Sequence, residues 1–90
     1  MDNQRKRLEY QSWHRGTKEL DLLLGQFFEA HGTVLNAEDI SLYQQLLEED
    51  DYDLYQWLTI STSVFPEKYK NLVQRIQAFQ HAEHIMRSPI

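Results

Sequence analysis

Apolar residues recur every three or four positions through most of this 90-residue chain, and that spacing constrains its fold most strongly. The clearest case lies within residues 20–28, where five apolar residues occupy positions i, i+3, i+4, i+7 and i+8. A helix with this pattern has one apolar face, which must be buried against other elements. Similar spacing recurs in residues 40–47, 54–58 and 69–79, and only residues 60–65 are ambiguous with a strand. The sequence therefore predicts an all-α fold.

Capping and helix-breaking residues divide this pattern into five predicted helices. Residues 3–12 are polar and helix-permissive, so the first helix would depend on a neighbour for its stability. Gly16 interrupts the run, and the second helix extends to about Gly32. Residues 59–63 are β-branched and hydroxylic and should form a loop. The short connections predict one small five-helix bundle, a single domain spanning residues 1–90. The predicted helix starts are three side-chain caps and a first-turn proline: Thr17, Asn36, Asp51 and Pro66.

The charge distribution argues against a nucleic-acid partner. The net charge is −5 and the pI is about 5.2, although residues 1–18 carry a net charge of +3. Residues 38–53 hold seven acidic residues and no basic one. Nucleic-acid binders usually present a basic face and have a high pI. No apolar run is long enough for a signal peptide or a membrane span, so we expect a cytoplasmic protein without membrane insertion.

The residues that usually carry chemistry are absent or incomplete. The chain has no cysteine, which excludes disulfides, iron–sulfur clusters and cysteine zinc sites. His81 and His84 have a spacing that could bind a metal, but two ligands leave a site incomplete, and a solvated tail explains them better. The acidic residues 48–53 lack the glycine and the spacing of a calcium loop and suit helix capping instead. We therefore expect no catalytic residue, no metal and no stably bound cofactor.

Residues 13–19, Trp-His-Arg-Gly-Thr-Lys-Glu, form an unusual segment at a predicted turn between helices. One interpretation is a turn glycine beside a solvated ion pair between Arg15 and Glu19, worth a few tenths of a kcal/mol. The other is a protein-binding hot spot, because arginine and tryptophan lie where a glycine permits close backbone approach. On either interpretation Glu19→Ala should cost less than about 1 kcal/mol of stability, whereas Asp51→Ala should cost about 1 kcal/mol through a lost cap.

These residues carry a resemblance to a known family. RGTKE, residues 15–19, fits the pattern RGxxE, and it follows KRLEYQS and precedes LDLLLGQFF and LYQQLLEEDDYDLYQWL. Over nearly the whole chain, this combination resembles the succinate dehydrogenase FAD assembly factors, also called flavinators. The resemblance implies a five-helix assembly factor that is not an enzyme. Such a factor promotes covalent attachment of FAD to the flavoprotein subunit of succinate dehydrogenase and, in bacteria, often of fumarate reductase.

The resemblance also implies which residues contact the flavoprotein. The chain departs from the family pattern at Thr17, where methionine is usual, and at Trp13 and His14, where bases are common; Trp13 could supply the lost apolar area. The factor itself would supply no nucleophile, would act on the FAD of its partner, and would be a monomer when free. The expected partner-binding residues are the motif and its neighbours: Arg15, Gly16 and Glu19, with Arg7, Tyr10 and Asp21 on the same surface.

Two alternatives belong to other classes. A helical antitoxin or generic protein-binding adaptor would also suit the acidic residues 38–53, and it would be found with some other stable partner. A small metal-dependent enzyme would instead contain bound metal after purification.

Overall fold

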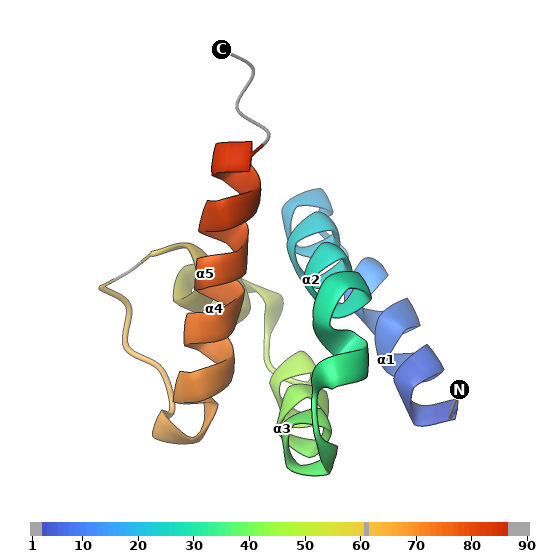
Figure 1. The fold of residues 1–90 in the computed structure, drawn as a ribbon. Coiled ribbons are helices and arrows are strands. Elements are labelled where there is room, and N and C mark those ends of the chain that lie inside the picture. The colour runs from blue at the N-terminus through green and yellow to red at the C-terminus, as the bar shows by residue number, and fades with distance from the viewer. Residues whose placement is uncertain (1–2, 61, 87–90) are drawn as a thin grey trace.

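The computed structural model describes residues 3–60 and 62–86, with side chains given as far as residue 80. His81 and His84 therefore have side chains that lie outside the description. The described residues form five α-helices and two short 3-10 turns and contain no strand, which confirms the all-α prediction (Figure 1). In chain order the elements are α1 (Asn3–Trp13), α2 (Lys18–His31), η1 (Gly32–Val34), α3 (Ala37–Leu47), α4 (Asp51–Thr59), η2 (Glu67–Tyr69) and α5 (Lys70–Met86).

Local side-chain caps start three of the helices. Thr17 Oγ1 accepts a hydrogen bond from the Leu20 N–H at 3.3 Å, and Asn36 Oδ1 accepts one from the Asp39 N–H at 2.8 Å. Both caps were predicted and are confirmed. The prediction for α4 is wrong by one residue, because Asp50 caps this helix by accepting from the Tyr52 N–H at 3.0 Å. Asp50 and Asp51 are both suitable N-cap residues, but the side chain of Asp51 pairs with Arg15 instead.

The start of the last helix also differs from the prediction. Pro66 has an extended ψ of 136° and lies just before η2, so it is outside the helix and not in its first turn. The 3-10 turn then places Tyr69 in the core and leads directly into α5.

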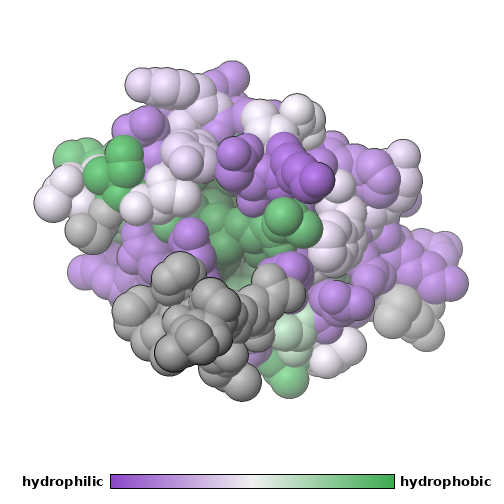
Figure 2. Space-filling view, turned by 90° about the horizontal axis from the view of Figure 1, so that it is seen from above, coloured by the Kyte–Doolittle hydropathy of each residue, from purple (hydrophilic) through white to green (hydrophobic). Residues whose placement is uncertain are grey.

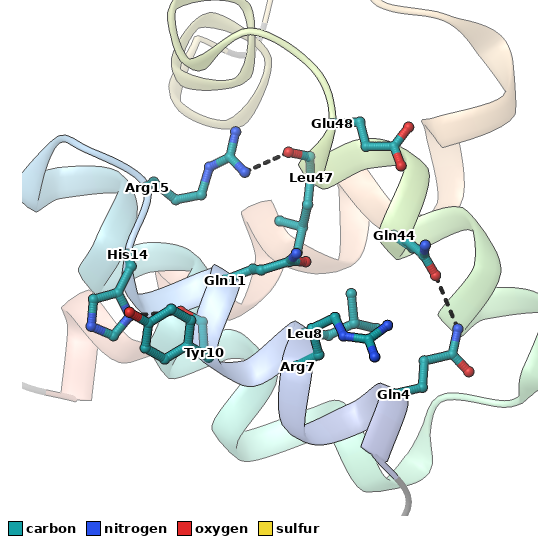
Figure 3. A pocket seen from close by; sticks show the side chains of 10 residues that line it. All are labelled: Gln4, Arg7, Leu8, Tyr10, Gln11, His14, Arg15, Gln44, Leu47 and Glu48. Atoms are coloured by element: carbon teal, nitrogen blue, oxygen red, sulfur yellow. Dashed lines mark hydrogen bonds between the residues drawn. The ribbon is translucent and has the colours of Figure 1, made fainter.

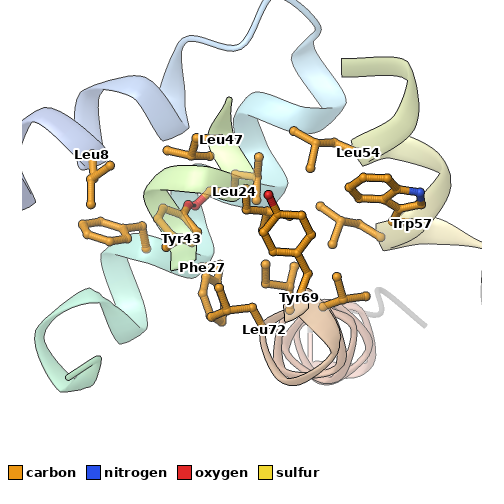
Figure 4. Close-up of a cluster of buried hydrophobic side chains, with 14 of the residues drawn as sticks. Leu8, Leu24, Phe27, Tyr43, Leu47, Leu54, Trp57, Tyr69 and Leu72 are labelled. Atoms are coloured by element: carbon orange, nitrogen blue, oxygen red, sulfur yellow. Dashed lines mark hydrogen bonds between the residues drawn. The ribbon is translucent and has the colours of Figure 1, made fainter. Parts of the chain in front are cut away.

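The core lies where the apolar faces of all five helices meet (Figure 4). In Figure 1, α1 runs beside α2, α3 lies below them, and α5 stands beside α4. The predicted core faces are confirmed, except that Leu23 and Phe79 are only partly buried. The buried apolar side chains are Leu8, Leu20, Leu24, Phe27, Phe28, Leu35, Ile40, Tyr43, Leu46, Leu47, Leu54, Trp57, Leu58, Tyr69, Leu72, Val73 and Ile76. The face of the molecule in Figure 2 is largely hydrophilic, with apolar atoms recessed near its centre.

A polar contact crosses this core between α1 and α3. The hydroxyls of Ser12 and Tyr43 hydrogen bond at 2.6 Å, and Ser12 also donates to the Leu8 carbonyl at 2.7 Å. Both residues are fully buried, and burial raises the pKa of the Tyr43 hydroxyl. The pairing satisfies two hydroxyls that would otherwise be costly inside the core.

The ring of Trp13, at the end of α1, packs directly onto Gly25 of α2. A Cβ atom on Gly25 would lie 2.2 Å from the ring of Trp13, so only glycine leaves room for this ring. Trp13 is partly buried and packs against α2. The buried part of its ring therefore contributes apolar area to the fold itself.

Candidate functional site

Arg15 fastens the turn between α1 and α2 to the junction between α3 and α4. Its Nε and Nη2 donate to Asp51 Oδ1 at 3.1 and 2.8 Å. Nη2 also donates to the Glu49 carbonyl at 3.1 Å, and Nη1 donates to the Leu47 carbonyl (Figure 3). The side chain is only 14% exposed, and four of its five N–H donors are used within the chain. We call this arrangement the Arg15 clasp.

The clasp corrects two expectations from the sequence. Among the described residues Arg15 pairs with Asp51 instead of Glu19, so the interpretation as a solvated ion pair between Arg15 and Glu19 is wrong. Asp51 is not the cap of α4 but the acidic partner of the clasp. The two side chains are 36 positions apart, and no local spacing in the sequence indicates that they meet.

Gly16 lies beside the clasp in a backbone conformation that favours glycine. Its φ is +115°, and a Cβ at this position would lie 3.3 Å from Asp51 Oδ2. The residue is exposed, so the turn presents bare backbone to solvent. Asp21 also supports this turn, because its carboxylate accepts a hydrogen bond from the Arg15 backbone N–H. The turn is therefore held in place by the side chains of Arg15 and Asp21.

A pocket of about 200 Å³ opens between α1 and the end of α3 (Figure 3). The rings of Tyr10 and His14 are stacked at its edge, with centroids 4.0 Å apart. A hydrogen bond of 3.0 Å joins Gln4 to Gln44 across it. Arg7 is exposed and has no hydrogen bond or ion pair within the described part of the chain. The pocket is lined by Gln4, Arg7, Leu8, Tyr10, Gln11, His14, Arg15, Gln44, Leu47 and Glu48.

A second concavity, the α2–α4 groove, also adjoins the clasp, because Asp51 is one of its lining residues. Its volume is about 330 Å³, and it is lined by Thr17, Glu19, Leu20, Asp51, Tyr52 and Tyr55. Tyr52 and Tyr55 are 71% and 41% exposed, which is high for aromatic side chains. Glu19 is exposed and forms no hydrogen bond or ion pair with any residue that the structure describes.

The structure thus sorts the six expected partner-binding residues into different positions. Arg7, Tyr10 and Arg15 meet at the α1–α3 pocket, and Glu19 lies at the α2–α4 groove. Gly16 is on the turn between them, while Asp21 is used to hold the turn. Three residues of this surface were not predicted from the sequence, namely Asp51, Tyr52 and Tyr55. All three fall in the segment that carried the family resemblance, but Asp51 was assigned only to helix capping and the two tyrosines were given no role.

One tyrosine near the α3–α4 junction has a strongly shifted pKa. Tyr69 is buried, and its hydroxyl donates to Glu49 Oε2 at 2.8 Å. Burial, reinforced by this hydrogen bond and by the charges of Glu49 and Glu48, raises the pKa of Tyr69 to about 12. The hydroxyl therefore stays protonated at neutral pH and joins η2 to the junction between α3 and α4.

Two features are absent from the described residues, namely a cluster of metal-binding side chains and a membrane-spanning helix. No group of three or more histidine, cysteine, aspartate or glutamate side chains among them is arranged to hold a metal ion. Within the same part of the chain, no helix combines the length and the apolar character needed to cross a membrane.

Fold and surface together define a small all-α protein whose most unusual feature is a braced, glycine-containing turn between two concavities. A family model described as "flavinator of succinate dehydrogenase" matches residues 6–80. The chain belongs to this family.

Three relatives from yeasts are all named "succinate dehydrogenase assembly factor 2, mitochondrial". The Candida glabrata protein is 39% identical over 95 residues, which cover 99% of this chain and 62% of the relative. The Saccharomyces cerevisiae S288c protein is 41% identical over 83 residues, covering 88% and 51%. The Meyerozyma guilliermondii protein is 36% identical over 94 residues, covering 98% and 70%. The chain thus spans between half and about two thirds of the length of these relatives.

Proposed function

We propose that this protein binds the flavoprotein subunit of succinate dehydrogenase through the surface around residues 15–19 and promotes covalent attachment of FAD there. The observation that carries the proposal is the family match over residues 6–80. The geometry supports it, because the clasp holds the turn rigidly while Gly16 and Glu19 remain exposed. A surface that is already ordered loses little conformational entropy on binding.

The bond to FAD forms within the partner in this proposal. The factor favours a flavoprotein conformation in which a histidine of the partner and the methyl carbon of the flavin are near attack distance. This chain supplies no nucleophile and holds no FAD of its own, so it assists without being an enzyme. The flavoprotein of fumarate reductase is a second substrate of the same kind. We further propose that the free protein is a monomer. We also propose a cytoplasmic location, which a fluorescent fusion would test.

The test uses a strain from which the gene has been deleted. The denatured succinate dehydrogenase flavoprotein is examined by in-gel flavin fluorescence, which detects only covalently bound FAD. We expect the signal to fall in the deletion strain, to return with the wild-type gene, and to return poorly with Glu19→Ala. Glu29→Ala is the matched control, because Glu29 is also an exposed acidic residue of α2 but lies outside both concavities near the turn.

Undiminished fluorescence in the deletion strain would contradict the proposal. Purification with another stable partner, and with unchanged flavin content in the cell, would support the adaptor alternative.

A further inference from the structure

The α2–α4 groove has an environment suited to one particular kind of side chain. Its floor is apolar, with Leu20 buried beneath it, and two exposed tyrosines form one wall. Exposed tyrosines that line a concavity are typical of the energetic centre of a protein interface, since their rings bury a large area at low entropic cost. The groove therefore has the character of a docking site.

The charges at the groove indicate the chemistry of its occupant. Two carboxylates line it, and Arg15 already neutralises that of Asp51 at 2.8 Å. The carboxylate of Glu19 has no partner among residues 3–60 and 62–86. Asp50 and Asp53 add negative charge next to the groove on the start of α4. An occupant that brings a positive charge is therefore complementary, whereas a purely apolar one would desolvate Glu19 without compensation.

We propose that the α2–α4 groove binds a single arginine side chain of the flavoprotein. Its methylene groups would lie on the apolar floor, and its guanidinium would stack on a tyrosine ring while it pairs with Glu19. Arginine fits better than lysine because its planar, weakly hydrated guanidinium both stacks on aromatic faces and binds carboxylates through two N–H groups. This inference rests on the proposed function and names the chemistry of the contact.

The experiment measures the affinity of purified variants for the purified flavoprotein subunit by isothermal titration calorimetry. Tyr52→Leu and Tyr55→Leu keep apolar area but remove the ring, whereas Tyr52→Phe and Tyr55→Phe keep the ring. We expect at least one leucine variant to bind about tenfold more weakly and its phenylalanine counterpart to bind within about twofold of wild type. Val34→Leu is the control, because Val34 is an exposed apolar residue of η1 that does not line the groove.

Glu19→Gln separates the charge from the shape of the groove. We expect it to weaken binding about tenfold and to reduce the dependence of affinity on salt concentration. Combined with the sensitive leucine substitution, it should cost less than the product of the two single effects, because both groups contact the same guanidinium. Thermal melts of each variant should match wild type, since these side chains are exposed.

The outcomes distinguish the two proposals. If wild type binds the flavoprotein and restores covalent FAD, but both leucine variants bind as tightly as wild type, the groove proposal alone is overturned. Full affinity of Glu19→Gln would also overturn it, whatever the leucine variants do, because the occupant would then bring no positive charge to the groove. Failure of wild type to bind the flavoprotein would overturn this inference together with the proposed function.

Discussion

At the scale of single residues, the Arg15 clasp is the most consequential contact in this protein. Arg15→Ala would leave the Leu47 and Glu49 carbonyls and the half-buried carboxylate of Asp51 without their donor. We expect a loss of about 2 kcal/mol in the free energy of unfolding. Urea denaturation followed by circular dichroism measures it. Arg7→Ala, on exposed α1 surface, should stay within about 0.5 kcal/mol of wild type, and equal losses in the two variants would contradict the clasp.

Asp50 and Asp51 are neighbours with different roles, and their alanine variants should show it. Asp50→Ala removes a helix cap and should cost about 1 kcal/mol. Asp51→Ala removes the acidic half of the clasp, so we expect a larger loss and, in combination with Arg15→Ala, strong non-additivity. A double-mutant cycle with urea denaturation measures the coupling. Strictly additive losses would show that the two side chains contribute independently.

Tyr69 makes stability depend on pH at the alkaline end. Its pKa is about 12 in the folded protein and about 10 in an unfolded chain. The unfolded chain therefore releases the proton first, so the stability that Tyr69 provides is complete below about pH 10 and is lost as the pH rises from about 10 to 12. Tyr69→Phe should lose stability less steeply over this interval in urea denaturation. Parallel curves for the two proteins would exclude a role for this hydroxyl.

Local signals and distant contacts differ in how far the sequence predicts them. The caps Thr17 and Asn36 were predictable, because each cap bonds to a backbone N–H three residues away. The clasp was not, because Arg15 and Asp51 meet only after the chain has folded. The same reason explains why one of the two interpretations of the motif paired Arg15 with Glu19, which is only four positions away.

At the scale of the helices, the packing of α1 against α2 depends on Gly25 and Trp13. Gly25→Ala places a Cβ into the indole, and we expect about 2 kcal/mol of destabilisation despite a gain of about 1 kcal/mol in helix propensity. In a Trp13→Ala background the clash is absent, so the same substitution should become neutral or stabilising. Thermal and urea unfolding of the four variants measure this reversal of sign, and destabilisation in both backgrounds would contradict the packing argument.

The helices were predicted with more success than the way they pack. Spacing and caps are properties of neighbouring residues, so they indicated all five helices and almost every buried face. The sequence did not indicate that Gly25 lies under an indole, since a glycine within a helix also suits many other surroundings. Nor did it indicate the two concavities, which are formed by side chains from separate helices.

At the scale of the whole molecule, the clasp joins one helical hairpin to the rest of the fold. The α1–α2 turn is held by carbonyls at the end of α3 and by a carboxylate at the start of α4. A partner that binds the exposed turn therefore contacts a segment that is fixed both to its own hairpin and to the junction between α3 and α4. The proposed binding surface is stiff because the contacts beneath it are shared with the fold.

The two tryptophans lie in different parts of this arrangement, which gives the protein two natural optical probes. Trp13 packs at the α1–α2 crossing, whereas the indole of Trp57 lies 6.0 Å from the ring of Tyr69, between α4 and η2. Replacing either tryptophan by phenylalanine leaves a single tryptophan. Its fluorescence then follows the unfolding of one part of the fold, either the α1–α2 hairpin or the region of α4 and η2. Coincident transitions in the two single-tryptophan proteins would show that the two parts unfold as one cooperative unit, and Arg15→Ala should then separate them.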